Sequence, residues 1–126
     1  MIELSLFTWS EVPEEQLTDK ISRKIITGKK VMLGQIFLKK GCVVVSHKHE
    51  SEQVTYILKG LLEFSLPNGK VRVGKDQVLV IPSNVEHGAV ALEDTIDLDI
   101  FNPIREDWLK GQDQYLRQDT SKKENA

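Results

Sequence analysis

The feature that most constrains the fold of this chain is a series of short apolar segments between about residues 24 and 101. The segments are rich in Val and Ile, and they are separated by glycines and by the turn-forming sequences Pro67-Asn68-Gly69 and Pro82-Ser83-Asn84. Strand-length apolar runs with this punctuation are typical of an all-β domain. We therefore expect strands near Lys24–Thr27, Val31–Leu38, Val43–Ser46, Val54–Lys59, Leu62–Leu66, Val71–Val73, Val78–Ile81, Gly88–Leu92 and Ile96–Phe101.

One hairpin can be predicted within this series. Residues 62–66 alternate apolar and polar side chains, as a strand does when one of its faces lies in a core. The sequence Asn68-Gly69 that follows is a strong hairpin-turn signal. Leu61–Val73 is therefore expected to form a β-hairpin.

The length of the chain fits a single domain. A protein of 126 residues and 14.3 kDa can bury one hydrophobic core. We expect residues 1–118 to form this domain, with residues 10–15 as a loop or helical turn and residues 105–109, which have an acidic start, as a short helix. Residues 119–126 have almost nothing apolar to bury and are expected to be disordered.

Charge and hydropathy argue against several classes of function. A formal net charge of −2 gives no electrostatic support for binding nucleic acid. No apolar stretch approaches the roughly 18–20 residues that span a bilayer, so we expect no membrane insertion. The single cysteine, Cys42, cannot form an intramolecular disulfide, and the first residues lack the features of a secretory signal. We expect a cytoplasmic protein in which Cys42 is a small core residue.

The histidines are the most informative polar residues of the sequence. There are only three, and two of them, His47 and His49, are separated by a single residue. Residues two apart in a strand project from the same face, so both imidazoles can point at one metal ion. The third, His87, follows the apolar run 78–81 and its turn. A solvated strand face explains the pair His47 and His49 equally well at this point.

The wider spacing closely resembles the first motif of the cupin family. Five residues separate Gly41 from His47, three separate His49 from Gln53, and six separate Gln53 from Gly60. In cupins this motif carries metal ligands. The resemblance therefore implies a cupin double-stranded β-helix, a jelly-roll barrel, that holds one divalent metal ion.

The second cupin motif can be followed through residues 76–87. Pro82 and His87 keep the spacing of the family, whereas Asp76 and Asn84 stand where the motif has glycine. Asn84 is a mild departure, because Asn tolerates a left-handed backbone. Taken together, the two motifs imply that the metal ligands are His47, His49, Gln53 and His87.

Gln53 stands where most metal cupins have glutamate. A glutamine offers only a neutral carbonyl oxygen, so three imidazoles and an amide would leave the charge of the ion uncompensated. Such a site should attract an anionic ligand, and a carboxylate-bearing substrate would fit. The alternative is that Gln53 is an ordinary hydrogen-bonded side chain in a protein that has lost its metal.

A second polar cluster follows in residues 97–108. Asp97, Asp99 and Phe101 alternate on one face of an expected strand, and buried acidic groups are costly unless they are paired or used. That face should therefore meet solvent or an active-site cavity. Arg105 is suited to bidentate capture of a carboxylate, although a surface ion pair with an acidic neighbour is the simpler interpretation.

This cluster, together with Gln53, resembles the pectin-degradation KdgF group of cupins. The matching residues are His87-Gly88, then Ala91–Asp94, then Leu98–Trp108; Ile104 departs from the proline that the group often has. The resemblance implies an enzyme that opens the ring of 4,5-unsaturated monouronates, a small anionic sugar substrate, to linear 5-keto-4-deoxyuronates. It implies Asp99, Phe101 and Arg105 as active-site residues.

Several points stay open at this stage. The metal can be Zn, Ni, Fe or Mn, because an imidazole-rich site accepts each of them. Similar cupins are commonly homodimers through their N-terminal strands, which is the expected assembly here. Another metal-dependent cupin enzyme, such as a dioxygenase or sugar isomerase, and a non-catalytic ligand-binding cupin are the alternatives. Trp9 and Trp108 are expected to cover barrel openings or a subunit interface.

Overall fold

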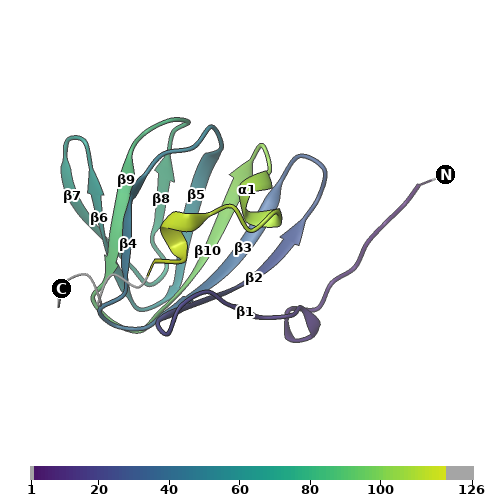
Figure 1. Cartoon of the computed structure of the whole chain (residues 1–126), viewed down its shortest axis with the longest axis horizontal. Coiled ribbons are helices and arrows are strands. Elements are labelled where there is room, and N and C mark those ends of the chain that lie inside the picture. The colour runs from purple at the N-terminus through teal and green to yellow at the C-terminus, as the bar shows by residue number, and fades with distance from the viewer. Residues whose placement is uncertain (1, 119–126) are drawn as a thin grey trace.

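The structure is a computed structural model that describes residues 2–118 (Figure 1). The expected disorder of residues 119–126 lies outside the described residues. Strands dominate, and helices are limited to short turns, as the all-β prediction required. The strands are β1 (Glu15–Gln16), β2 (Ile21–Thr27), β3 (Met32–Leu38), β4 (Val43–His47), β5 (Glu52–Lys59), β6 (Leu61–Leu66), β7 (Gly69–Gly74), β8 (Val78–Ile81), β9 (His87–Ala91) and β10 (Thr95–Asn102). The helical turns are η1 (Trp9–Glu11), α1 (Glu106–Leu109) and η2 (Gln114–Leu116).

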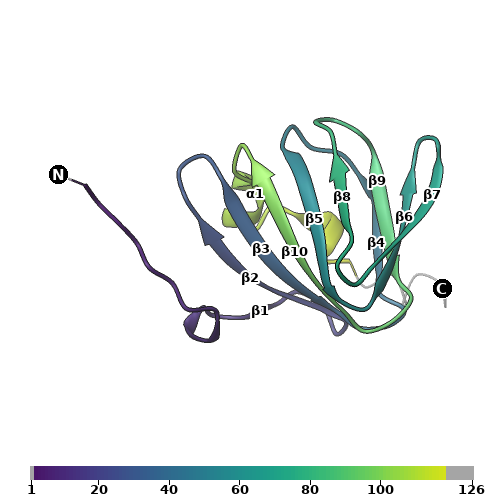
Figure 2. The same ribbon diagram turned by 180° about the vertical axis from the view of Figure 1, so that it is seen from behind.

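The strands form two antiparallel sheets that face each other across the core. One sheet has the order β1-β2-β3-β10-β5-β8 and the other has the order β4-β9-β6-β7. Figures 1 and 2 show the two sheets as opposite walls of one open-ended barrel. Buried side chains alternate along β3 and β10, so each strand turns one face inward.

Antiparallel pairing of β10 with β5 fixes the positions of four buried side chains. The register places Asp99 opposite Thr55 and Phe101 opposite Gln53. All four side chains are buried, although three of them are polar. Because the side-chain period of a strand is two, this single register brings all of them to the inner face together.

Turn residues behave as the sequence indicates. The hairpin is confirmed, with β6 paired to β7 and Leu66 opposite Gly69, which has a φ of 130°. Asn84 and Asp76, which replace motif glycines, both have left-handed backbone with φ of 62° and 65°. Asn and Asp are the non-glycine residues that tolerate this region best, so the replacements keep the turns of the motif.

Several strand limits differ from the expected ones. Strand β5 begins at Glu52 rather than at residue 54, because pairing with β8 and β10 extends the strand through Gln53. Strand β4 ends at His47, so His49 lies in the following loop rather than in the strand. Alternation along a strand is therefore not the whole reason that His47 and His49 converge.

The C-terminal segment, residues 103–118, lies across one opening of the barrel. It contains α1, which confirms the expected short helix, and η2, which contacts β4 on the other sheet (Figure 1). Trp108 is buried against the inner sheet face at Gly34, where an added Cβ would lie 2.7 Å from the indole ring. A side chain at position 34 would displace Trp108, so glycine allows this close approach.

The remaining expectations about single residues can be checked directly. Trp108 covers a barrel opening as predicted, whereas Trp9 lies on η1 and is only half-buried. Cys42 is a buried core residue, and burial raises the pKa of its thiol. None of the helices among residues 2–118 has the length and apolar character that crossing a membrane would require.

Candidate metal centre

The three histidines converge on one point at the end of the barrel that the C-terminal segment covers. His47 ends β4 and pairs directly with His87 at the start of β9, while His49 reaches the same point from the loop after β4. One ring nitrogen of each lies within 4.8 Å of the others. The clustering that the sequence indicated is therefore present in the fold.

Backbone hydrogen bonds orient all three imidazoles. The Nδ1 atoms lie 2.8–2.9 Å from carbonyl oxygens two residues away, those of Val45, Ser51 and Val85. A carbonyl can only accept, so each Nδ1 carries the proton and each Nε2 presents a lone pair. Burial lowers the pKa of His47 to about 3 and that of His49 to about 4, and it also lowers the pKa of His87. All three rings are neutral at pH 7, the form that binds a metal.

The surroundings of these Nε2 atoms are those expected where a cation binds. His49 Nε2 lies 3.1 Å from Gln53 Oε1, which places two acceptor atoms face to face. The buried His87 Nε2 has no hydrogen-bond partner anywhere in residues 2–118. Two ligands bound to one ion at about 2.1 Å lie about 3.0–3.4 Å apart in octahedral or tetrahedral geometry. The donor set therefore fits a metal ion, which would also remove the conflict between the two acceptors.

Gln53 is held by a chain of buried hydrogen bonds. Its Nε2 donates to Thr55 Oγ1 at 2.8 Å, and the Thr55 hydroxyl donates to Asp99 Oδ1 at 2.7 Å. The pairing of β5 with β10 described above brings these three side chains together. The amide oxygen of Gln53 consequently faces His49 and not the interior of the sheet.

Asp97 and Asp99 form a buried acidic pair beside this chain. Both line a cavity of about 40 Å³ that also touches His47, His87 and Phe101. Burial raises the pKa of Asp99 to about 6, and burial together with the neighbouring Asp99 raises the pKa of Asp97 well above its usual value. The inward face of β10 therefore meets a cavity and not solvent, and burial favours the protonated form of both carboxyl groups.

Arg105 lies near the histidines, with part of its hydrogen-bonding capacity in use. Its Nε and Nη2 donate to the carboxylate of Asp107 at 3.0 and 2.8 Å, and Nη2 also donates to Tyr115 Oη at 2.9 Å. Within the described part of the chain, the buried Nη1 has no partner. The ion pair with an acidic neighbour is thus present, and the Nη1 nitrogen is left to donate to a ligand. The guanidinium also lies 5.0 Å from the ring of Phe101.

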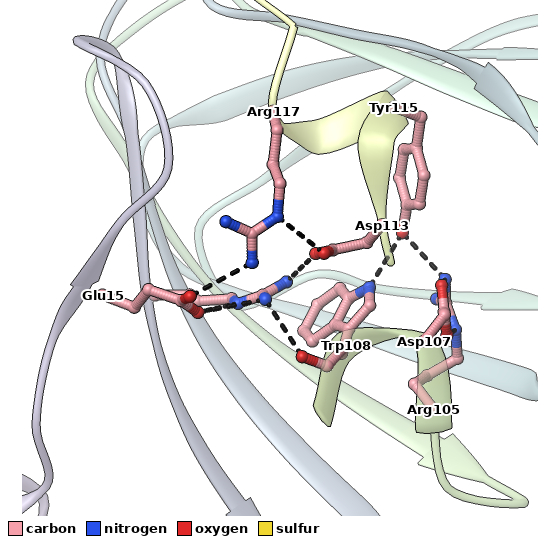
Figure 3. Close-up of polar contacts among 8 residues, drawn as sticks. Glu15, Arg105, Asp107, Trp108, Asp113, Tyr115 and Arg117 are labelled. Atoms are coloured by element: carbon pink, nitrogen blue, oxygen red, sulfur yellow. Dashed lines mark hydrogen bonds and ion pairs between the residues drawn. The ribbon is translucent and has the colours of Figure 1, made fainter. Parts of the chain in front are cut away.

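Tyr115 is a site residue that the sequence did not indicate. Its ring stacks on His47 with a centroid separation of 3.8 Å, and its hydroxyl accepts hydrogen bonds from Arg105 and Trp108 (Figure 3). It lies beyond Trp108, where the residues that match the KdgF group end. Thr55, by contrast, could have been found, because it lies two residues after Gln53 on the same strand face.

A buried ion-pair network fastens the C-terminal segment to the barrel. Arg23 of β2 pairs with Asp113, and both side chains are fully buried. Glu15 contacts Arg23 at 3.0 Å, and Arg117 bridges Asp113 and Glu15 (Figure 3). The Arg23 guanidinium also lies 4.5 Å from the ring centre of Trp108. Tyr115 is therefore held over His47 by contacts on both sides of it.

Comparisons with known proteins agree with this geometry. The model of the cupin domain matches residues 35–102. The pectin degradation protein KdgF of Dickeya dadantii (strain 3937) is 33% identical over 106 residues, which cover 82% of this chain and 96% of that protein. The structure of KdgF from a Halomonas species matches with a TM-score of 0.77 and 33% identity, covering 82% of this chain and 99% of that one. An RmlC-like cupin from Shewanella frigidimarina matches with a TM-score of 0.78, 23% identity and coverage of 84% and 96%, which supports the fold alone.

Proposed function

This chain belongs to the cupin family, in the group of the pectin degradation protein KdgF, and we propose that it opens the ring of 4,5-unsaturated monouronates to linear 5-keto-4-deoxyuronates. The observation that carries the proposal is the meeting of two clusters in one cavity. His47 and His87 line it from one side, and Asp99 and Phe101 line it from the other. A dioxygenase or a passive binding cupin has no need of the second cluster.

The reaction needs proton transfer and stabilisation of negative charge. In the substrate, the ring oxygen joins the anomeric carbon to the C4=C5 double bond. Cleaving the bond from the anomeric carbon to that oxygen leaves an aldehyde and an enolate at C5, and protonation at C4 gives the ketone without net addition of water. A divalent metal, when bound by His47, His49, Gln53 and His87, supplies Lewis-acid stabilisation of such an enolate.

The positions of the protein side chains support the following proposed roles. Asp99 accepts the proton of the anomeric hydroxyl or delivers a proton to C4, and a pKa of about 6 makes both forms accessible near neutral pH. The free Nη1 of Arg105 donates to the substrate carboxylate. Phe101 forms an apolar wall for the sugar ring.

The cavity between the two sheets is small compared with the proposed substrate. A volume of about 40 Å³ holds about three water molecules, since each needs roughly 10–15 Å³. A monouronate has about twelve non-hydrogen atoms and needs several times more space. Tyr115 and Leu116 line this cavity from the C-terminal segment, and His49 and Arg105 line a second hollow of about 470 Å³.

One experiment tests the function together with the identity of the metal, for which Zn, Ni, Fe and Mn are the candidates. Protein purified without a chelating tag is analysed for bound elements and then assayed on unsaturated galacturonate and mannuronate generated by lyases. We expect loss of the C4=C5 double bond, dependent on the metal, with chelated protein as the control. Metal-loaded protein that leaves both sugars unchanged would refute the ring-opening activity.

We also propose a homodimer assembled through the N-terminal arm, residues 2–7. The arm runs away from the barrel in Figure 1, and its apolar side chains Ile2, Leu4 and Leu6 are 85%, 89% and 96% exposed. Alternate apolar residues in an extended arm suit pairing with a second copy. Leu4→Ser with Leu6→Ser should convert the dimer to monomer in light scattering, whereas Val71→Ser on the hairpin should not. A monomeric wild-type protein would overturn the proposal.

A further inference from the structure

We propose that Thr55 is a positioning residue that holds the Gln53 amide with its carbonyl oxygen toward the histidines. The inference rests on the metal site of the proposed function and deepens it. The observation that carries it is the one-way hydrogen-bond chain from Gln53 through Thr55 to Asp99.

A glutamine ligand has a difficulty that a glutamate ligand does not have. The two ends of its amide are similar in size, and rotation about the last side-chain bond exchanges them. Only the oxygen end can bind a cation, because the nitrogen end carries two hydrogens that the cation repels. A carboxylate presents an oxygen in either orientation. Gln53 therefore needs a neighbour that distinguishes the two ends of the amide.

Thr55 can make this distinction because its hydroxyl has only one hydrogen. That hydrogen is donated to Asp99 Oδ1 at 2.7 Å, so the Thr55 oxygen can only accept from Gln53 Nε2 at 2.8 Å. A rotated Gln53 would set its carbonyl oxygen against an oxygen with no hydrogen left to give. Leaving two buried acceptors unpaired in this way is unfavourable, so the rotated amide is disfavoured.

The surroundings keep the chain intact. Thr55 is fully buried, and Gln53 and Asp99 are nearly so, so bulk water does not compete for these hydrogen bonds. Backbone pairing fixes the spacing, because Thr55 lies opposite Asp99 and two residues from Gln53 in the same strand. The orientation of the amide is thus built into the register of β5 and β10.

The test is a comparison of Thr55 variants in two backgrounds. Thr55→Val removes the hydroxyl and keeps the shape, and Thr55→Ser keeps the hydroxyl and serves as the matched control. Each is made in the wild-type protein and in Gln53→Glu protein, and affinity for Ni²⁺ or Co²⁺ alone is measured by competition with a chelator. Thermal melts of the metal-free proteins show whether each variant is folded.

We expect Thr55→Val to lower metal affinity about 10–100-fold in the wild-type background, the usual effect of losing a group that orients a ligand. In the Gln53→Glu background the same change should cost less than about threefold, because a carboxylate needs no orientation. Thr55→Ser should stay close to wild type in both. If Thr55→Val does not fold, Thr55→Ala provides the same comparison.

Two results would overturn the proposal. An equal loss of affinity in both backgrounds would make Thr55 a merely structural residue, and no loss with Gln53 present would mean that the amide is oriented without it. Because no sugar is present in the measurement, failure of the ring-opening activity on uronates leaves this result unaffected. Wild-type protein that binds no metal would remove the basis of the inference itself.

Discussion

The buried pair of Arg23 and Asp113 should contribute strongly to stability, and Asp113→Asn tests this. Both side chains are inaccessible to solvent. Removing one charge of such a pair leaves the other buried without compensation, which typically costs about 3–5 kcal/mol. Arg23 keeps its contact with the half-exposed Glu15, so we expect a loss near the lower limit, about 3 kcal/mol.

This loss can be converted to a shift in melting temperature. Unfolding entropy amounts to about 2.1 cal/mol/K per residue, or about 0.25 kcal/mol/K for a domain of this size. A loss of about 3 kcal/mol should therefore lower Tm by about 12 °C. The matched control is Glu63→Gln, which breaks ion pairs with the largely exposed Arg72 and Lys70. These two surface pairs together contribute about 1 kcal/mol, so Tm should fall by about 4 °C.

The assay is calorimetric melting of metal-free protein at neutral pH. Metal-free protein is chosen because bound metal would add its own stabilisation and mask the difference. The reasoning fails if Asp113→Asn and Glu63→Gln lower Tm by the same small amount. It also fails if removing the Asp113 charge raises Tm, which would mean that the cost of burying the pair exceeds its attraction.

The remaining predictions concern the site itself. His87→Ala should lower metal affinity by more than about 100-fold, so elemental analysis should find little bound metal. A cooperative melt should show that the barrel is still folded, and metal content near wild type would refute the site. Gln53→Glu should keep or tighten metal binding but lower kcat, on the order of tenfold, because the added charge weakens stabilisation of an enolate, and an unchanged kcat would count against this. Asp99→Asn should keep metal binding, since Asn still offers an acceptor to its neighbour, while kcat falls roughly 10²–10⁴-fold; wild-type kcat would remove Asp99 from the mechanism. Arg105→Lys should mainly raise KM, because one ammonium cannot reproduce the guanidinium contacts, and a loss confined to kcat would contradict a binding role.

Part of the site was predictable from the sequence, from the close spacing of two histidines and from the resemblance to the two cupin motifs. His47, His49 and His87 lie at turns and strand ends of the motifs, where a few residues set the direction of a side chain. The hairpin at Gly69 was predictable for the same reason. For the hairpin and for the pair His47 and His49 the information lies within about ten residues of sequence. His87 lies 38 residues beyond His49 and meets His47 through pairing of β4 with β9, and only the resemblance to the second cupin motif assigned it to the same site.

Contacts between distant parts of the chain were not predictable in this way. Arg23 and Asp113 are 90 residues apart, and neither belongs to a motif. Tyr115 stacks on His47 only because the C-terminal segment returns across the barrel, which no periodicity in its sequence indicates. The possible roles of Arg105 could not be separated either, since the choice depends on which of its nitrogens Asp107 occupies.

The protonation of the acidic pair explains how an anionic substrate could be accepted in a cavity that contains two aspartates. Two ionised carboxylates there would cancel the charge of a divalent ion held by neutral ligands and would repel a uronate. Burial raises the pKa of both carboxyl groups, and the neighbouring Asp99 raises that of Asp97 further, so the pair favours holding a proton. At most one negative charge then remains on the pair, so a divalent ion held by neutral ligands would keep a net positive charge, while Asp107 balances the Arg105 guanidinium. Replacing Gln53 by a carboxylate would remove this surplus, which gives the neutral ligand a physical reason to be present.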